Sequence, residues 1–175
     1  MDRRPEFVQP EIRRNEILGL LRQGLEDVSA SRSRFSWGVP FPRPTGDGEP
    51  QTTYVWFDAL PNYWTAARFP ESGASWPASL HVVGKDITRF HCVIWPAMLH
   101  AAGLPVPERV WAHGFINYGG DRLSKSAGVQ LDLREAIQRH GPDALRYFLL
   151  REVGFSNDGT FSWERLDERY VSDLA

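Results

Sequence analysis

A loop between residues 119 and 128 carries the residue types that best suit contact with a polyphosphate. Its sequence, GGDRLSKSAG, places Lys125 between Ser124 and Ser126, with Arg122 three residues before the lysine and glycines at both ends. Glycine permits backbone conformations that other residues avoid, lysine supplies a mobile point charge, and serines supply hydroxyl donors. The same composition also suits a solvated hairpin tip. The loop alone leaves phosphate contact and a surface turn as open alternatives.

Composition narrows the class of protein but identifies no partner. The chain has 175 residues, 42% of them hydrophobic, and a formal net charge of -2. This length suits one domain, and this charge gives no overall basic field for nucleic acid. Cys92 is the only cysteine, which excludes an internal disulfide and a zinc site built from paired thiolates of this chain. We expect a reducing, cytoplasmic location, no signal peptide and no membrane-spanning segment.

Strand-like and helix-like segments alternate along much of the chain. Apolar residues at three- and four-residue spacing predict an amphipathic helix from Glu11 to Val28, followed by a surface connection over residues 41–51. Strands are predicted at residues 52–57, 80–83 and 109–112, with helices from Asp58 as N-cap toward Ala67 and from Ile87 to Ala102. This alternation predicts an α/β fold with a parallel sheet and right-handed crossovers.

Ligands of such a sheet bind at the carboxyl ends of its strands. Those ends carry Asp58, residues 84–86 and the pair His113-Gly114. Gly84 permits close approach of a ligand, and the Asp86 carboxylate can accept hydrogen bonds from ribose hydroxyls or, equally well, cap a helix.

The last third of the chain is predicted to be helical. Asp132 can cap a helix from Leu133 to Arg139, and the sequence His140-Gly141-Pro142 separates it from a second helix that runs to about Val153.

Several motifs follow one another in a specific order. They are YVWFDAL at residues 54–60, GKDI at 84–87, Phe90-His91, WPA at 95–97, RLSKS at 122–126 and GPDALRYFL at 141–149. In this order they resemble methionyl-tRNA synthetase, a class I aminoacyl-tRNA synthetase, and RLSKS is similar to the Lys-Met-Ser-Lys-Ser loop of that class. The resemblance spans nearly the whole chain.

The resemblance implies the C-terminal half of the catalytic domain. The fold would be the second half of a Rossmann-type parallel-sheet nucleotide-binding domain, followed by the start of an α-helical region. Residues 1–132 would complete the catalytic domain, and residues 133–175 would begin a helical stem-contact region that leads to an anticodon-binding domain. The family's first half, with a His-Ile-Gly-His-type motif and a zinc-bearing insertion, has no counterpart in these residues, so we expect the chain alone to be inactive.

The resemblance also implies a reaction and a set of site residues. Methionine would be activated by ATP to methionyl-adenylate and transferred to tRNA, with Mg²⁺ expected beside ATP and no zinc site in this chain. Lys125 and Arg122 are the catalytic candidates. The ATP-binding candidates are Gly84, Asp86, Ile116, Ser124, Lys125, Ser126 and Arg32.

Methionine recognition requires an apolar, polarisable pocket, because a thioether forms weak hydrogen bonds but packs well on aromatic rings. The chain has seven tryptophans and ten phenylalanines, enough for a core and a stacking pocket. Four-residue spacing predicts that Ala59 shares a helix face with Tyr63, and His91 with Trp95. By resemblance the methionine-binding candidates are Trp56, Ala59, Leu60, Tyr63, Phe90, His91 and Trp95.

Two alternatives stay open. A class I synthetase for another apolar amino acid would share the phosphate loop but not the aromatic pocket. A truncated paralogue would bind nucleotide, tRNA or a partner protein without catalysis, since the first half of the catalytic domain is missing from these residues.

Overall fold

The computed structural model describes residues 3–43, 46, 48–68, 75–118, 121–122, 131–154 and 156–175, with only the backbone of residues 121 and 122. In chain order the strands are β1 (Val8–Gln9), β2 (Ser31–Arg32), β3 (Thr52–Thr53), β4 (His81–Gly84), β5 (Val110–His113), β6 (Ile116–Tyr118), β7 (Asp121–Arg122) and β8 (Gly159–Phe161). The helices and helical turns are η1 (Pro5–Phe7), α1 (Glu11–Gln23), α2 (Val55–Ala59), α3 (Asn62–Arg68), η2 (Lys85–Ile87), η3 (Phe90–Ile94), α4 (Trp95–Ala101), α5 (Leu133–Glu152), α6 (Trp163–Arg169) and η4 (Tyr170–Leu174).

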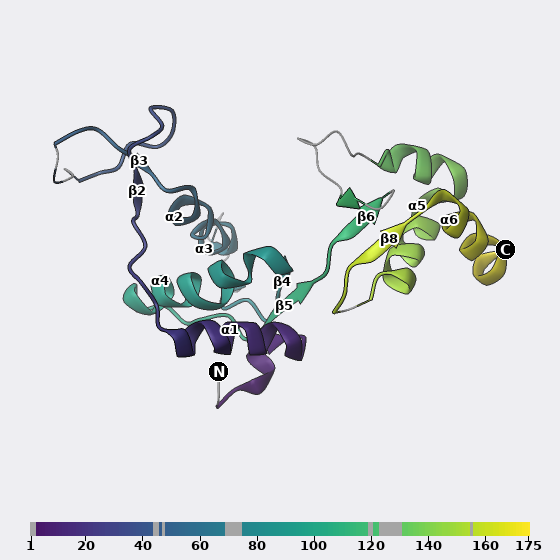
Figure 1. The fold of residues 1–175 in the computed structure, drawn as a ribbon, viewed down its shortest axis with the longest axis horizontal. Helices are drawn as coiled ribbons and strands as arrows, with labels where there is room; N and C mark the ends of the chain where they lie inside the picture. Colours follow the sequence, from purple (N-terminus) through teal and green to yellow (C-terminus); the bar gives the residue numbers. More distant parts are fainter. Residues whose placement is uncertain are drawn as a thin grey trace.

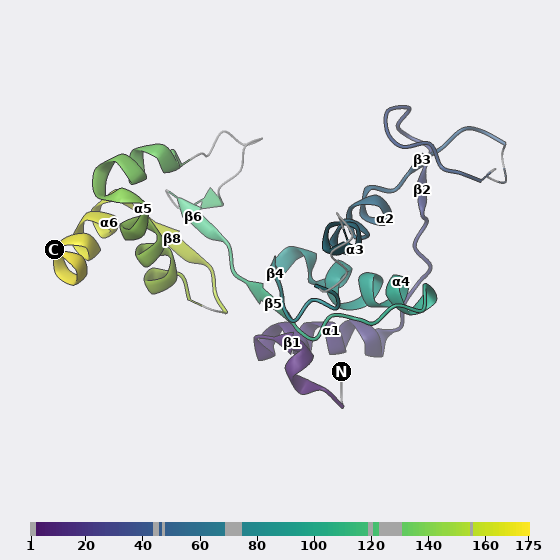
Figure 2. The ribbon, with the colours of Figure 1, turned by 180° about the vertical axis from the view of Figure 1, so that it is seen from behind.

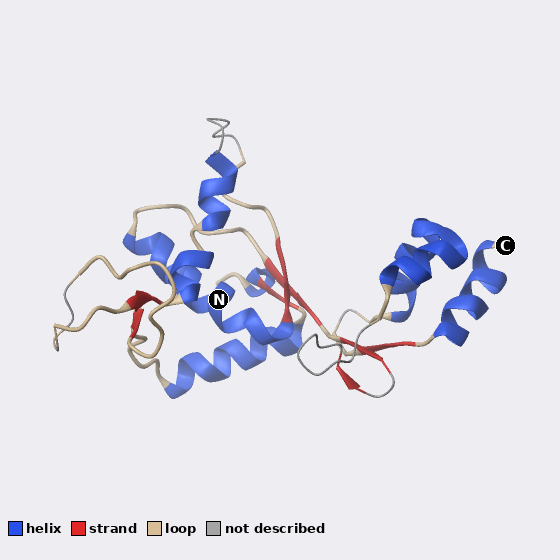
Figure 3. Ribbon diagram, turned by 90° about the horizontal axis from the view of Figure 1, so that it is seen from above, coloured by secondary structure: helices blue, strands red, loops and turns tan. Residues whose placement is uncertain are grey.

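These elements form two lobes joined by the short segment between β5 and β6 (Figure 1). The views from the front and from behind agree that β6 and β8 lie side by side next to α5 and α6, away from α1 and α4 (Figure 2). From above, strands form the narrow connection between two groups of helices (Figure 3). None of the helices in the described segments is long and apolar enough to cross a lipid bilayer.

A three-stranded parallel sheet forms the centre of the first lobe. Its order is β1-β5-β4, so the first strand of the chain lies beside a strand that follows it by about a hundred residues. The predicted α/β class and parallel sheet are confirmed, and two of the predicted strands are found within one residue of their expected bounds. The third strand is β1 and not the segment at residues 52–57.

Helices cover one face of this sheet. The register pairs Val110 with Val8 on one side and with His81 on the other, so the three side chains point to the same face, where they are buried. Ile17 of α1 and Cys92 of η3 pack into the same core. Burial raises the pKa of the Cys92 thiol to about 12, so the thiol stays neutral within this core.

The opposite face of the sheet is partly open among the residues that the structure describes. Val82 in the middle of β4 is 55% exposed, and Leu80 just before it is 48% exposed. A hollow of about 550 Å³ lies along this side, lined by Leu80, Gln9 and Trp111 among others. Parallel sheets usually have both faces covered, so this face is suited to packing against a further part of a larger domain.

The strand predicted at residues 52–57 is wrong. Only Thr52–Thr53 form a strand, β3, which pairs antiparallel with β2 in a separate two-stranded sheet. The chain then turns into α2 as Leu60 N–H donates to Trp56 O at 3.1 Å. The Trp56 ring stacks on Phe90 at 4.0 Å, and this packing outweighs the strand preference of an aromatic and β-branched run.

Two further predictions, on the role of Asp58 and on the end of α1, need correction. Asp58 lies inside α2, so it neither caps α3 nor stands at the edge of the parallel sheet. Helix α1 ends at Gln23 and not at Val28, because Gly24 adopts a φ of 93° that terminates the helix. The apolar spacing continues to Leu25, but this residue lies beyond the end of the helix and is 51% exposed.

The helix predicted from Ile87 to Ala102 is present but changes geometry along its length. It opens as η2, passes through the π-helical turn η3, continues as α4 and closes before Gly103, whose φ is 68°. Trp95 N–H donates to Phe90 O, five residues back, and the next residue, Pro96, has no N–H to donate. We attribute the π-helical turn to this missing donor.

The second lobe packs α5 and α6 against the sheet β7-β6-β8. Asp132 caps α5 by accepting from Arg134 N–H at 2.8 Å, and Gly141, with a φ of 85°, divides α5 into two helical parts, as predicted. The Glu152 carboxylate joins α5 to α6 by accepting from Arg165 at 2.5 Å and from Arg169 at 2.6 Å. The expected division between residues 132 and 133 falls inside this lobe, so it does not coincide with the boundary between the two lobes.

Phe148 tests the core of the second lobe. It is 1% exposed and meets Phe161 edge to face, with ring centroids 5.3 Å apart. We expect Phe148→Ala to lower the free energy of unfolding by about 3–5 kcal/mol, measured by urea unfolding of the chain. Leu150→Ala on the same helix, where the side chain is 75% exposed, should change it by less than about 0.5 kcal/mol. Equal effects of the two substitutions would contradict this core.

Candidate functional site

The carboxyl edge of the parallel sheet brings Gly84 and His113 together in register, at the ends of β4 and β5. A Cβ on Gly84 would lie 2.9 Å from Asp86 Oδ1, closer than side chains tolerate, so glycine is what allows that carboxylate to lie against the turn. Asp86 is exposed within η2, whose N-cap is Gly84, so Asp86 does not cap this turn. The edge therefore presents a carboxylate over a small residue, the arrangement expected for a ribose contact.

Ile116, the candidate for contact with the adenine edge, lies in the other lobe. It begins β6, pairs in parallel register with Gly159 and packs its side chain against the core of the second lobe. Gly84 and Asp86 belong to the first lobe. The predicted ATP site therefore spans the joint between the lobes, and its shape depends on how that joint is held.

The phosphate-loop candidates are only partly covered by the structure. Ser124, Lys125 and Ser126 lie outside the described residues. The backbone of Arg122 belongs to β7 and pairs with Asn117 of β6, so the loop leaves from a short hairpin on the second lobe. The roles of these four residues stay predictions.

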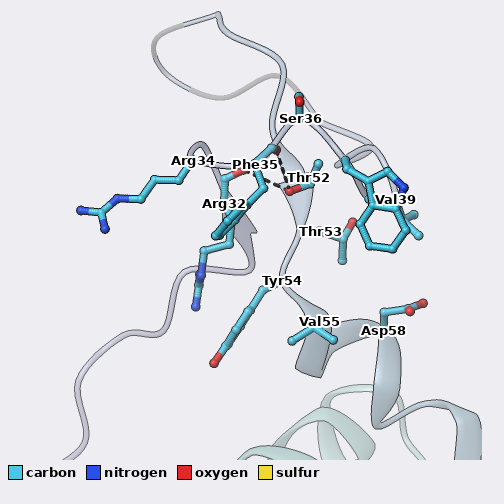
Figure 4. Close-up of a pocket in the computed structure, with 12 residues that line it drawn as sticks. Arg32, Arg34, Phe35, Ser36, Val39, Thr52, Thr53, Tyr54, Val55 and Asp58 are labelled. Atoms are coloured by element: carbon cyan, nitrogen blue, oxygen red, sulfur yellow. Dashed lines mark hydrogen bonds between the residues drawn. The ribbon is translucent and has the colours of Figure 1, made fainter. Parts of the chain in front are cut away.

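Arg32 lies at the opposite end of the molecule from β6, in the two-stranded sheet β2–β3 (Figure 1). Its guanidinium stands 3.4 Å from the centroid of the Tyr54 ring and donates to Ser29 O at 2.9 Å and to Ser31 O at 2.8 Å. Figure 4 shows Arg32 above Tyr54 at a hollow of about 670 Å³ that Asp58 also lines. The structure does not bring Arg32 together with Gly84 and Asp86.

Six of the methionine-binding candidates gather in one aromatic cluster between α2, α3 and the η3–α4 helix: Trp56, Leu60, Tyr63, Phe90, His91 and Trp95. Trp56 stacks on Phe90 with an angle of 13° between the rings and meets His91 edge-on at 6.3 Å. Leu60 is fully buried, and Trp95 is 3% exposed. Aromatic faces and a buried aliphatic side chain make an apolar, polarisable environment of the kind that a thioether prefers.

A hydrogen-bonded pair lies inside this cluster. His91 Nδ1 is 3.0 Å from Ile87 O, which can only accept, so Nδ1 carries the proton of the neutral ring. Nε2 is then the acceptor for the Tyr63 hydroxyl at 2.9 Å. Burial lowers the pKa of His91 and raises the pKa of Tyr63, so both groups stay uncharged at neutral pH. The Tyr63 hydroxyl is thereby fixed in direction by a residue 28 positions away.

The two pairs predicted to share helix faces fare differently. His91 and Trp95 lie on one continuous helical stretch and are both buried. Ala59 ends α2 whereas Tyr63 lies in α3, so no single helix carries this pair, and its shared face stays a prediction. Proline at position 61 separates the two helices.

Sequence reasoning missed His81 and Trp76 as members of the cluster. His81 is 4% exposed, and its ring lies 4.4 Å from that of Tyr63 and 5.9 Å from that of His91. Trp76 meets Trp95 edge-on at 5.8 Å. The signal for His81 is its position two residues before buried Val83 on β4, which places both on the helix-covered face.

Two buried donors or acceptors of the cluster, His81 Nε2 and Trp95 Nε1, have no hydrogen-bond partner among the described residues. Within the same residues, no group of three or more His, Cys, Asp and Glu side chains is placed to hold a metal ion. The cluster is therefore suited to a largely apolar guest that offers a few polar contacts. Among the described residues, single carboxylates such as Asp86 could hold Mg²⁺ together with bound phosphates.

This fold, with its parallel sheet and carboxyl-edge turn, is the Rossmann-type fold of class I synthetases. The sequence profile of the tRNA synthetases class I (M) matches residues 2–175. The chain belongs to this family.

Relatives and solved structures give the same assignment. The chain is 50% identical to the methionine–tRNA ligase of Brucella suis over 175 residues, covering 98% of this chain and 33% of the relative. It is 47% identical to that of Mycobacterium leprae over 179 residues, covering 99% and 33%. The Mycobacterium tuberculosis methionyl-tRNA synthetase in complex with methionyl-adenylate superposes with a TM-score of 0.86 at 46% identity, covering 99% of this chain and 34% of that one.

The chain thus spans about a third of the length of the relatives that it matches. The matched region belongs to their N-terminal part and not to their C-terminal half. The expectation that the chain is the C-terminal half of the catalytic domain concerns that domain and not the whole length of the relatives. It stays a prediction.

His81 gives a pH prediction. Burial, together with the nearby His91, lowers the pKa of His81 to about 4, whereas an unfolded histidine titrates near 6.5. Between these values the unfolded chain binds a proton that the folded chain does not, so the stability contributed by neutral His81 is complete above pH 6.5 and is lost as the pH falls toward 4. The pKa difference corresponds to about 3 kcal/mol.

Urea unfolding at pH 7 and pH 4.5 measures this effect. His81→Phe should lose less stability between these pH values than the unsubstituted chain. His100→Phe, at an exposed histidine on α4, is the matched control and should leave the pH dependence unchanged. An unaltered pH dependence in His81→Phe would contradict the assignment.

Proposed function

We propose that the chain is the second half of the catalytic domain of a methionyl-tRNA synthetase, which activates methionine with ATP and transfers it to tRNA. Residues 1–132 complete the nucleotide-binding domain, and residues 133–175 begin the helical region beyond it. The activity belongs to the complete enzyme, and the isolated chain is inactive.

The aromatic cluster around the Tyr63–His91 pair is the observation that carries this proposal. Strand β4 runs from His81 in the cluster to Gly84 at the sheet edge, a span of about 10 Å at 3.3 Å per residue. Asp86 lies two residues after Gly84. Ile87, the next residue, has the carbonyl to which His91 is hydrogen-bonded. An aromatic cluster and a carboxylate suited to ribose therefore lie at the two ends of one short stretch, which supports recognition of a methionyl-adenylate.

In the proposed first step the methionine carboxylate attacks the α-phosphate of ATP. The bond to the β-phosphate breaks, and methionyl-adenylate and pyrophosphate are formed. Proteins accelerate such transfers by aligning the reactants and stabilising the charge that develops on the phosphates. We assign that charge stabilisation to Lys125 and Arg122, with Ser124 and Ser126 as hydroxyl donors.

We assign the remaining ligand contacts by resemblance, and the cluster and the sheet edge support the assignments for methionine and ribose. Asp86 holds the ribose beside Gly84, and the backbone of Ile116 meets the adenine. The methionine side chain packs against Trp56, Phe90 and Trp95, with Ala59 and Leu60 forming the wall and the Tyr63–His91 pair oriented toward the sulfur. Mg²⁺ would accompany ATP and offset the negative charge of its phosphates.

The proposed partners are methionine, ATP, tRNA and the first half of the catalytic domain. The half-open parallel sheet, with Val82 and Leu80 exposed, offers a surface for that first half. A cytoplasmic location follows from the proposed role in protein synthesis.

Lys125→Ala tests the catalytic assignment in a complete synthetase that contains these residues. Loss of one preorganised charge should cost about 3 kcal/mol or more of transition-state stabilisation, roughly a hundredfold or greater fall in the rate of adenylate formation. Methionine affinity should change little. The assay is methionine-dependent exchange of pyrophosphate into ATP, with Lys125→Arg as the charge-retaining control. Equal losses of rate and methionine affinity would refute the assignment.

The isolated chain provides a separate test. We expect it to show no methionine-dependent pyrophosphate exchange, because the other side of the nucleotide site is contributed by the first half. Adding that half as a separate polypeptide should restore exchange. Robust exchange by the chain alone would contradict the proposal, and no restoration would favour a paralogue that binds without catalysis.

A further inference from the structure

We propose that Lys85 is a positioning residue for adenylate formation, because it joins Asp158 to the Phe115 segment and so fixes the hairpin that carries the phosphate loop. This inference rests on the proposed function and adds to it. Lys85, Phe115 and Asp158 come from three separated parts of the chain, and we call them the joint.

One carboxylate oxygen joins the two lobes at the joint, beside a separate contact in which Arg13 of α1 donates to Ser156 O at 3.2 Å. Asp158 Oδ1 accepts from Lys85 Nζ at 2.6 Å and from the Phe115 backbone N–H at 2.8 Å. Lys85 Nζ also lies 4.7 Å from the centroid of the Phe115 ring, within the range of a cation–π contact. These two charge-assisted hydrogen bonds hold the pKa of Asp158 below its usual value, so the carboxylate stays ionised at neutral pH.

The backbone around the joint leaves little room for adjustment. Gly114 is buried, and a Cβ there would lie 2.1 Å from Asn157 O, so no larger residue fits without moving the chain. Gly159 N–H donates to Phe115 O at 2.8 Å, and the β6–β8 ladder starts at the next residue. The direction of β6 is therefore set at Phe115.

Everything that β6 carries depends on that direction. Ile116 is its first residue, and its partner β7 contains Arg122, from which the chain continues to Lys125. Lys85 itself lies between Gly84 and Asp86, the candidate ribose contacts. The joint thus links the turn predicted to hold the ribose with the hairpin predicted to hold the phosphates, and a displacement of about 1 Å between such groups can slow a reaction a hundredfold.

The ion pair is poorly suited to a purely stabilising role. The Lys85 side chain is 24% exposed and that of Asp158 is 33% exposed. Partly solvated pairs contribute little to folding. The larger consequence of the ion pair is geometric, because its carboxylate oxygen binds groups from both sides of the connection between the lobes.

Pyrophosphate exchange in the complete synthetase tests the proposal with three variants. Lys85→Met keeps the length of the stem but removes the charge, and should lower kcat about tenfold or more while leaving KM for methionine within about twofold. Lys85→Arg keeps a cation that can bind the carboxylate and stack on the ring, and should restore most of the rate. Arg146→Met removes an ion pair to Asp143 that lies within α5, with side chains 79% and 94% exposed, and should have no effect.

Hydrogen exchange of the Phe115 amide in the 175-residue chain gives a readout that does not depend on activity. Lys85→Met should speed this exchange, and Arg146→Met should not. An unchanged Phe115 amide, a Lys85→Arg rate as low as that of Lys85→Met, or a parallel rise in KM for methionine would each overturn the role of Lys85. Absence of methionine-dependent pyrophosphate exchange in the unsubstituted complete enzyme would instead refute the proposed function.

Discussion

Two donors on one carboxylate oxygen hold this structure together where it is narrowest. Asp158 receives Lys85 from the first lobe and the Phe115 amide from the connecting segment, and Gly114 packs against Asn157 beside them. Arg13 of α1 adds a contact across the same place by donating to Ser156 O at 3.2 Å. Because β6 and β7 lead into the phosphate loop, the relative position of the two halves of the proposed ATP site follows from these contacts.

A different constraint shapes the aromatic cluster. Burial disfavours charge on His81 and His91, so a cluster with two histidines behaves as a neutral, polarisable environment. The carbonyl of Ile87 determines which nitrogen of His91 carries the proton, and this in turn directs the Tyr63 hydroxyl. The π-helical turn before Pro96 lies in the same helix and sets the course along which Phe90, His91 and Trp95 are presented.

Much of this arrangement could be predicted from the sequence. Local signals identified β4 and β5, the cap at Asp132 and the break at Gly141, since each depends on residues close together in the chain. The segment at residues 52–57 could not be predicted in this way, because its strand-like composition is overruled by stacking of Trp56 on Phe90. Strand β1 was also missed, because its two residues form a strand only by pairing with β5, about a hundred residues away.

The candidate site shows the same division between local and distant information. Most members of the aromatic cluster were found by motif. His81, Trp76 and the joint were not, because they contact partners 10 to 73 positions away. Arg32 was expected near the other ATP-binding candidates, yet the structure places it on the distant β2–β3 sheet.

The central claim is that the aromatic cluster and the sheet edge receive the two ends of one methionyl-adenylate. A crystal structure of the complete synthetase with a non-hydrolysable methionyl-adenylate analogue tests it most directly. The account predicts the thioether within contact of Tyr63, His91 and Trp95, and the ribose hydroxyls within hydrogen-bond distance of the Asp86 carboxylate. An analogue bound with its sulfur outside the cluster, or with its ribose away from Asp86, would contradict it.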